Sequence, residues 1–288
     1  MKLISIGLPA YNRASIIRRT LDSLLSQTYG NFELIISDDA STDGTEQICR
    51  EYAERDKRIR YTKQESNLGV KGNFYFVLGE AHGQYFMRAS DDDWWAPDFL
   101  EKLITPLENN SEYICSMSSF ARVYNNGEVE ENLIFDSGLN DAGRYEIFKR
   151  ILMRKKGFDH LDFGIIKTDV FRKITSRQPP DKGWDAIICA ELALAGKIYF
   201  NSEILRFNNN KLESPREKIS KISPKPAKKL NKFKLPIVST TYANLFLNAL
   251  WRGLTSRVVP WRRKMFLIFP WLGALYSKRK KFFGFYCK

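Results

Sequence analysis

Short apolar segments alternate with amphipathic segments along residues 3–107, and this alternation is the strongest constraint on the fold. Each apolar segment has the length of a buried strand, and the segments between them repeat apolar residues at helical spacing. The expected strands are Leu3–Leu8, Phe32–Ser37, Ile59–Thr62 and Tyr85–Ala89, and the expected helices are Ala14–Gln27, Thr45–Asp56, Val70–Ala81 and Phe99–Leu107. Strands and helices in this order predict an α/β fold with a doubly wound, mostly parallel sheet.

The pattern is looser between residues 111 and 210. The expected elements are a strand at Tyr113–Val123 entering a hairpin turn at Asn125–Gly127, a helix at Tyr145–Met153, a strand at Phe163–Ile166, a helix at Asp185–Ala195 and a strand at Ile198–Phe200. We expect residues 1–110 and 111–210 to form two halves of one domain. Residues 211–288 are expected to form a basic C-terminal extension that contains helices.

The charge of the chain is divided unevenly between these parts. The formal net charge is +13. Residues 211–288 hold 19 basic and two acidic residues, a net charge of +17, whereas residues 1–210 hold 27 basic and 31 acidic residues, a net charge of −4. A uniformly basic nucleic-acid-binding domain does not have this distribution. Four cysteines far apart and two histidines argue against a disulfide scaffold and a zinc site, and predict buried, reduced thiols.

The basic extension alternates apolar and basic segments. Residues 235–276 place tryptophans and arginines beside short apolar segments, and a run of four basic residues follows at 278–281. This pattern is typical of helices that lie in the headgroup layer of an anionic membrane. A solvated tail whose helices pack on the domain, and nucleic-acid binding, are the alternatives. No apolar stretch is long enough to span a bilayer, and the start of the chain resembles a strand rather than a signal peptide.

Polar residues follow three of the expected strands at the point where each strand ends. They are Pro9–Arg13, Asp38–Asp39 and Ser90–Asp93. Because ligands bind at the carboxyl ends of strands in such sheets, we expect the three segments to meet at one site. A cluster of acids needs a cation, and carboxylate oxygens favour Mg²⁺ or Mn²⁺, which in turn bind substrate phosphates. Arg13 or Lys71 can supply further positive charge.

Each of these segments also has a purely structural interpretation. Asp38–Asp39 can serve turns and helix caps, Asp91–Asp93 can be a solvated loop, and Pro9–Asn12 can be a simple turn. Trp94 and Trp95 argue against a solvated loop, since large apolar side chains directly after the acids favour burial.

An ordered set of short motifs runs through residues 3–107. Its segments are Pro9–Asn12, Gln27–Tyr29, Asp38–Thr45, Asn67–Gly69, Asn73, Ala81–Gly83 and the acid run before Pro97–Asp98. As an ordered set, these motifs resemble the family 2 glycosyltransferases of the GT-A fold. The resemblance implies a Rossmann-like GT-A sheet, with the nucleotide-sugar site in residues 1–110 and the acceptor site in residues 111–210.

The resemblance also implies roles for individual residues. The nucleotide-sugar site would include Pro9, Tyr11, Asn12, Arg13, Asp39, Lys71 and Asp91. Asp92 and Asp93 would bind Mn²⁺ or Mg²⁺, and Asp185 would be the catalytic base, with Asp181 as its competitor. The chain departs from the family pattern at Ser90, where an Asp is usual, at Trp184, where a Glu is usual, and by the absence of a histidine near Phe207–Asn210. His82 and His160 are expected in packing or surface roles.

The function implied is inverting transfer of a sugar from a nucleotide-diphosphate sugar to a hydroxyl group. The acceptor would be a glycan or a lipid-linked molecule, in surface polysaccharide biosynthesis, with the protein bound peripherally through residues 235–288 at the cytoplasmic face of the cell membrane. One alternative is a non-catalytic protein that binds sugar nucleotides or acts as a scaffold. Another is a nucleotidyltransferase, but Pro9–Arg13 lacks the glycine-rich phosphate loop which that class usually has.

Overall fold

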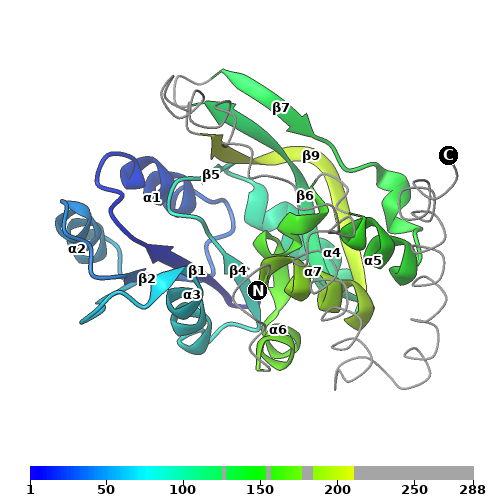
Figure 1. Cartoon of the computed structure of the whole chain (residues 1–288), viewed down its shortest axis with the longest axis horizontal. Coiled ribbons are helices and arrows are strands. Elements are labelled where there is room, and N and C mark those ends of the chain that lie inside the picture. The colour runs from blue at the N-terminus through cyan, green and yellow to red at the C-terminus, as the bar shows by residue number, and fades with distance from the viewer. Residues whose placement is uncertain (125–127, 154–156, 177–183, 211–288) are drawn as a thin grey trace, which may run out of the picture.

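The residues that the structure describes form one mixed sheet with helices on both faces (Figure 1). The computed structural model describes residues 1–124, 128–153, 157–176 and 184–210. The strands are β1 (Ile4–Ala10), β2 (Phe32–Asp38), β3 (Ile59–Lys63), β4 (Tyr85–Arg88), β5 (Trp94–Trp95), β6 (Tyr113–Tyr124), β7 (Val129–Leu133), β8 (Ile165–Lys167) and β9 (Lys197–Asn210). The helices are α1 (Ile17–Leu25), α2 (Thr45–Arg55), α3 (Gly69–Gly79), α4 (Phe99–Asn109), α5 (Arg144–Leu152), α6 (Thr168–Thr175) and α7 (Trp184–Ala195), with 3₁₀ turns η1 (Ser137–Asn140) and η2 (Phe158–Phe163).

The strand order confirms the predicted α/β fold. In the described residues it is β3-β2-β1-β4-β8-β6-β9-β5, with β7 paired to β6. The first four strands are parallel to one another, β8 is antiparallel to β4 and β6, and β9 is parallel to β6. Residues 1–110 and 111–210 therefore share a single sheet, although the boundary between the halves stays a prediction.

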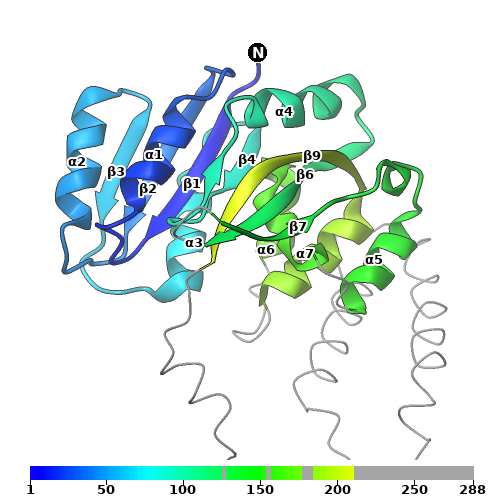
Figure 2. The same ribbon diagram turned by 90° about the horizontal axis from the view of Figure 1, so that it is seen from above.

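Alternating side chains of β1 separate the two faces of the sheet. Ile4, Ile6 and Leu8 are fully buried in the core that includes α1, α2 and α4. Gly7 faces α3 on the opposite side, where an added Cβ would lie 2.8 Å from Val77 Cγ2. The ribbon shows α1 and α3 on opposite sides of β1 (Figures 1 and 2). A glycine at this position lets α3 approach the sheet closely.

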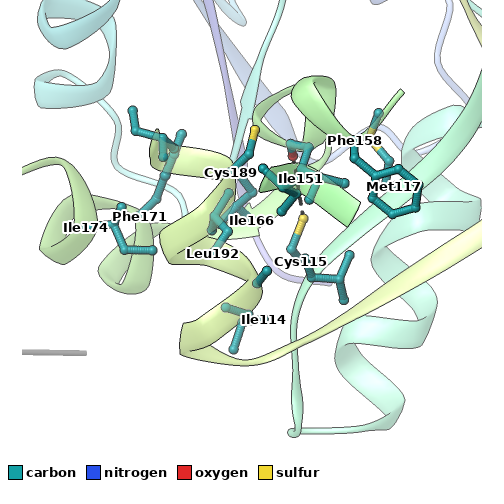
Figure 3. Close-up of a cluster of buried hydrophobic side chains, with 14 of the residues drawn as sticks. Ile114, Cys115, Met117, Ile151, Phe158, Ile166, Phe171, Ile174, Cys189 and Leu192 are labelled. Atoms are coloured by element: carbon teal, nitrogen blue, oxygen red, sulfur yellow. Dashed lines mark hydrogen bonds between the residues drawn. The ribbon is translucent and has the colours of Figure 1, made fainter. Parts of the chain in front are cut away.

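A second core lies where β6 packs against α5, α6 and α7 (Figure 3). It contains Cys115 and Cys189, which are buried and free, as is Cys49 in the first core. The expectation of buried, unpaired thiols is confirmed for these three cysteines. Cys287 lies outside the described residues.

Several elements differ from the sequence predictions. β1 continues beyond the expected end at Leu8, because its pairing with β4 ends at Gly7 while its pairing with β2 continues to Ala10. β9 is a strand of 14 residues, far longer than the expected Ile198–Phe200. β5 and α6 were not expected. The hairpin of β6 and β7 is confirmed, although its turn at residues 125–127 lies outside the described residues.

The extension at residues 211–288 lies outside the described residues, so its predicted helices are not described. Within the described part of the chain, no helix combines the length and the apolar character that crossing a membrane requires.

Candidate active site

Polar residues from the ends of β1, β2 and β4 line a single pocket of about 350 Å³. The predicted residues Pro9, Tyr11, Arg13, Asp39, Asp91 and Asp92 are among its lining residues, whereas Asn12, Lys71, Asp93 and Asp185 are not. The expectation that three strand ends converge is thus confirmed. Asp38 follows the structural alternative, because its carboxylate accepts from the Ser41 amide in a turn and from the Tyr61 hydroxyl.

Asn12 joins the loop after β1 to the loop after β2. Its amide donates to the Ser41 hydroxyl at 2.9 Å, and its side-chain oxygen accepts from the Thr42 amide at 2.9 Å. Asn12 has a φ of 52° and Ala40 a φ of 60°, so both loops turn through the left-handed region. Asn12 therefore holds together the loop after β1 and the loop after β2, and both loops contribute residues to the pocket.

Asp91 lies between the backbone of the first loop and a guanidinium group. Its carboxylate accepts from the Tyr11 amide at 3.1 Å and from Arg13 Nε at 3.0 Å. Burial raises the pKa of Asp91 to about 6, against the opposing charge of Arg13 and with the help of nearby Asp92. The positive charge of Arg13 is therefore directed at Asp91.

Asp39 holds the loop that leads into α3. Its two carboxylate oxygens accept from the Leu68 amide at 2.6 Å and the Gly69 amide at 3.0 Å. Gly69 has a φ of +75°, a conformation that glycine adopts without strain. Each oxygen keeps a second lone pair, so Asp39 can still accept from a ligand in the pocket.

Two consecutive acids, Asp92 and Asp93, lie in different environments. Asp92 lines the pocket and accepts from the Ser90 hydroxyl at 2.7 Å. Asp93 is fully buried and turned toward β9, where its carboxylate accepts from Arg206 Nε at 2.9 Å and from Asn208 Nδ2 at 2.9 Å. The Asn209 amide also donates to Asp93, at 3.2 Å. Of the two predicted metal ligands, Asp92 lines the pocket, whereas hydrogen bonds from Arg206, Asn208 and Asn209 occupy Asp93.

The interpretation of Asp91–Asp93 as a solvated loop is wrong, since Asp91 is 9% and Asp93 0% exposed. Among the described residues, no group of three or more histidine, cysteine or acidic side chains is arranged to hold a metal ion. Mg²⁺ and Mn²⁺ are commonly held by one or two carboxylates together with substrate phosphates. Asp92, with Asp91 beside it, fits such a partial donor set but not a metal site made by protein alone.

Arg88, the last residue of β4, lines the pocket beside these acids. Its Nη1 donates to Asp162 Oδ2 at 2.5 Å, and Asp162 is fully buried. The guanidinium carbon lies 4.6 Å from the centroid of the Phe163 ring and 4.8 Å from that of Trp184. Arg88 is thereby held by a carboxylate and by aromatic rings at the edge of the pocket.

Asp185 follows Trp184 in the first turn of α7, and its Oδ1 accepts from the Ala186 amide at 2.8 Å. Trp184 packs against Phe74 with ring centroids 5.1 Å apart and lies against Arg88, which lines the pocket. Asp185 is thus one residue away from a side chain that borders the pocket wall. The competing residue Asp181 lies outside the described residues, and Lys71 is half-buried on α3.

The model of the family described as "Glycosyl transferase family 2" matches residues 5–175 of the chain. The chain belongs to glycosyl transferase family 2. The GlyA glycosyltransferase of Streptococcus pneumoniae is 33% identical over 183 residues, which cover 57% of this chain and 26% of that protein. The putative teichuronic acid biosynthesis glycosyltransferase TuaG of Bacillus subtilis is 38% identical over 116 residues, 40% of this chain and 45% of that protein.

The matched segments span between about a quarter and a half of these relatives' own lengths. Solved structures resemble this family 2 chain in fold. A structure of S. aureus TarS in complex with UDP-GlcNAc has a TM-score of 0.65 at 18% identity and covers 100% of this chain and 76% of its own. The mannosyltransferase PcManGT from Pyrobaculum calidifontis, in complex with GDP-Man and Mn²⁺, has a TM-score of 0.54 at 16% identity and covers 96% and 75%.

Three site residues of this family 2 chain were missed from the sequence: Arg88, Asp162 and Arg206. Arg88 ends an otherwise apolar strand, and a charged residue at that point was an available signal. Asp162 and Arg206 carried no such signal, because their importance comes from partners 74 and 113 residues away in the chain.

The substitution Arg206→Met should lower the free energy of unfolding by about 3–5 kcal/mol, because it leaves the buried carboxylate of Asp93 without its charged partner. Urea denaturation of the full chain measures this change. Asp92→Asn is the matched control in the same acid run, and we expect it to change stability by less than about 1 kcal/mol. Equal effects of both substitutions would contradict the distinction between the two acids.

The two histidines lie in different settings. His82 is exposed, and its amide donates to Glu33 Oε1 at 2.7 Å. His160 packs against Phe120, with ring centroids 5.0 Å apart, and against Phe163. Burial, together with the positive charges of Arg206, Arg122 and Arg88, lowers the pKa of His160 to about 3. Neither histidine lines the pocket, which fits the packing and surface roles expected for them.

Stability should fall as the pH drops from about 6.5 toward 4, because the unfolded chain takes up a proton on His160 that the folded chain does not. In His160→Gln this contribution disappears, so the variant should lose roughly 2 kcal/mol less than the parent between pH 7.5 and 4.5. Urea denaturation at several pH values measures the difference. Parallel profiles for the two proteins would show that His160 is protonated in the folded state.

Proposed function

We propose that the protein is an inverting glycosyltransferase that uses a nucleotide-diphosphate sugar as its donor. The observation that carries the proposal is the pocket at the ends of β1, β2 and β4, where Asp39, Asp91 and Asp92 converge with Arg13 and Arg88 in a family 2 chain. Pockets at this edge of an α/β sheet bind ligands, and the acids suit a substrate that arrives with a cation.

The donor would lie across the pocket from β2 to β4. The nucleoside would occupy the end formed by Asp39 and the Asn67–Gly69 loop, where backbone and carboxylate oxygens can accept hydrogen bonds from a base. Tyr11, which is 42% exposed at the pocket, offers a ring for contact with the base or ribose. The transferred sugar would then lie at the β4 end, nearest to Asp185.

Mn²⁺ or Mg²⁺ bound to Asp92 would neutralise the diphosphate and stabilise it as a leaving group. The side chain of Asp92 is suited to this position because it lines the pocket and, within the described part of the chain, its hydrogen-bond partner is the neutral Ser90 hydroxyl. Arg13 would hold Asp91 in place beside it.

Asp185 would accept the proton of the acceptor hydroxyl as that oxygen attacks the anomeric carbon. The bond between this carbon and the diphosphate oxygen breaks in the same step, so the configuration at the carbon inverts and the nucleoside diphosphate leaves. The first turn of α7 fixes Asp185, because the Ala186 amide already donates to one of its oxygens.

We propose further that the acceptor is a glycan or a lipid-linked molecule and that the protein acts in surface polysaccharide biosynthesis. The curated name of TuaG, a relative of this chain, refers to teichuronic acid biosynthesis. The basic residues of 235–288 support peripheral binding at the cytoplasmic face of an anionic membrane, where a lipid-linked acceptor would be available.

A non-catalytic protein that binds sugar nucleotides is the second candidate. Trp184 stands where the family usually has an acid, and its ring packs against Phe74 and Arg88 instead of offering a carboxylate. Ser90 likewise replaces an acid in the pocket. Catalysis would then be absent while binding of the nucleotide persisted.

Asp92→Ala and Asp185→Asn should each reduce turnover of the donor by at least about 10²-fold, because one removes the metal ligand and the other the base. A thermal-shift screen with UDP, GDP, dTDP and CDP sugars and Mn²⁺ first identifies the donor, and release of the nucleoside diphosphate then measures turnover. We expect Asp185→Asn to bind the donor normally and Asp92→Ala to lose the effect of Mn²⁺ on binding.

Full turnover by Asp185→Asn would exclude it as the base. Donor binding without any turnover in the parent protein, with a panel of glycan and lipid acceptors, would favour the non-catalytic candidate.

Flotation with liposomes tests the membrane proposal. The full chain should bind vesicles that contain phosphatidylglycerol, and binding should weaken as salt rises, because the attraction is electrostatic. A chain without residues 235–288 should bind at least tenfold less. Equal binding of both chains, or equal binding to neutral vesicles, would contradict the proposal.

A further inference from the structure

Arg88 lies at one end of the pocket, away from the segment expected to hold the nucleoside. β1 lies between β2 and β4 in the sheet, so Asp39 after β2 and Arg88 at the end of β4 are on opposite sides of β1. Next to β4 come β8 and the turn η2, which carries Asp162. Arg88 therefore belongs to the end of the pocket where the sheet passes into the second half of the chain.

One carboxylate and three aromatic rings hold the guanidinium group of Arg88 in place. Asp162 accepts from Nη1 at 2.5 Å, and the Phe74, Phe163 and Trp184 ring centroids lie 5.3, 4.6 and 4.8 Å from the guanidinium carbon. The Arg88 side chain is 12% exposed, and this exposed part lines the pocket. A planar group fixed in this way presents its remaining N–H donors in set directions.

The positive charge of Arg88 is already balanced. Asp162 is fully buried, so its carboxylate interacts with Arg88 in a medium where charges are weakly screened. The neighbouring acids Asp92 and Asp185 add negative charge. Their hydrogen-bond donors, the Ser90 hydroxyl and the Ala186 amide, are neutral and do not balance this charge. This end of the pocket thus offers directed donors without an excess of positive charge.

We propose that Arg88 is a specificity-determining residue that donates hydrogen bonds to hydroxyl groups of the transferred sugar, and that this sugar is neutral rather than a uronic acid. The inference rests on the proposed function and adds the class of sugar. A hydroxyl oxygen accepts well from a fixed guanidinium, whereas a carboxylate would be repelled by Asp92. Among the described residues that line the pocket, the cations are Arg13 and Arg88, and each is already paired with a carboxylate.

Asp162 acts on the sugar only through Arg88 and is a positioning residue. It also accepts weakly from the Cys189 thiol, at 3.7 Å, which ties its position to α7. If Asp162 becomes neutral, Arg88 keeps a hydrogen-bond partner but regains a net charge. The preference of the pocket for neutral sugars should then weaken, while the nucleoside end stays unchanged.

Isothermal titration calorimetry of the full chain with Mn²⁺ tests the proposal. The probes are the nucleoside diphosphate that binds, its neutral hexose derivative and its hexuronate derivative, for example UDP, UDP-glucose and UDP-glucuronate. We expect the parent protein to bind the glucuronate at least tenfold more weakly than the glucose. In Arg88→Met the Kd for UDP should change by less than threefold, while the ratio of the UDP-glucose Kd to the UDP Kd should rise about tenfold.

Two further variants keep the test informative if Arg88→Met is unstable. Arg88→Lys keeps a positive charge beside Asp162 but loses the planar set of N–H donors. It should therefore also raise the ratio of the UDP-glucose Kd to the UDP Kd. Asp162→Asn should reduce discrimination against UDP-glucuronate at least threefold without changing the Kd for UDP. Arg55→Met, which removes a surface arginine paired with Glu51, is the matched control and should behave as the parent.

Three results would overturn the proposal. One is an equal rise of the UDP and UDP-glucose Kd values in the Arg88 variants, since Arg88 would then serve the diphosphate or the fold. Another is unchanged binding of all probes by those variants. The third is tighter binding of UDP-glucuronate than of UDP-glucose. If no nucleoside diphosphate binds the parent protein, the proposed function fails, and the inference about the sugar fails with it.

Discussion

The ion pair of Asp93 and Arg206 is the interaction on which the arrangement of the site depends. Both side chains are buried, and Asn208 and the Asn209 amide complete the coordination of the carboxylate. The pair joins the acid run, which follows β4, to β9 at the far side of the second half. Removing two charges from water is costly, so the pair does more to define the position of the acid run than to increase stability. Asp92 owes its place in the pocket to a neighbour anchored in this way.

From that pair a continuous row of packed side chains leads to the other end of the pocket. The guanidinium carbon of Arg206 lies 4.0 Å from the centroid of the Phe163 ring, and that of Arg88 lies 4.6 Å from it. Asp162, directly before Phe163, pairs with Arg88. The turn η2 therefore contacts both arginines, and it links the residues proposed for the metal to those proposed for the sugar. A substitution in η2 would therefore alter the positions of residues at both ends of the pocket.

The sequence alone predicted those features of the fold and the site that depend on residues close together in the chain. Alternation predicted the first half of the sheet, and the rule for strand ends predicted that Asp39, Asp91 and Asp92 would meet. It could not separate Asp92 from Asp93, because the difference comes from Arg206, which lies 113 residues further along the chain. β9 was underestimated because polar residues at Asn201–Glu203 interrupt its apolar pattern where its register with β6 shifts. Trp94, read only as a residue that favours burial, pairs with Phe207 and so begins β5.

The two hydrogen bonds from the Leu68 and Gly69 amides to Asp39 have a consequence for the thermodynamics of binding. These bonds lie within the chain and hold the loop before α3 in place, so the entropy of ordering this backbone is lost during folding. A nucleotide then binds to a loop that is already ordered, so more of its interaction energy contributes to affinity. Association should accordingly follow a single step, with one observed rate that rises in proportion to nucleotide concentration.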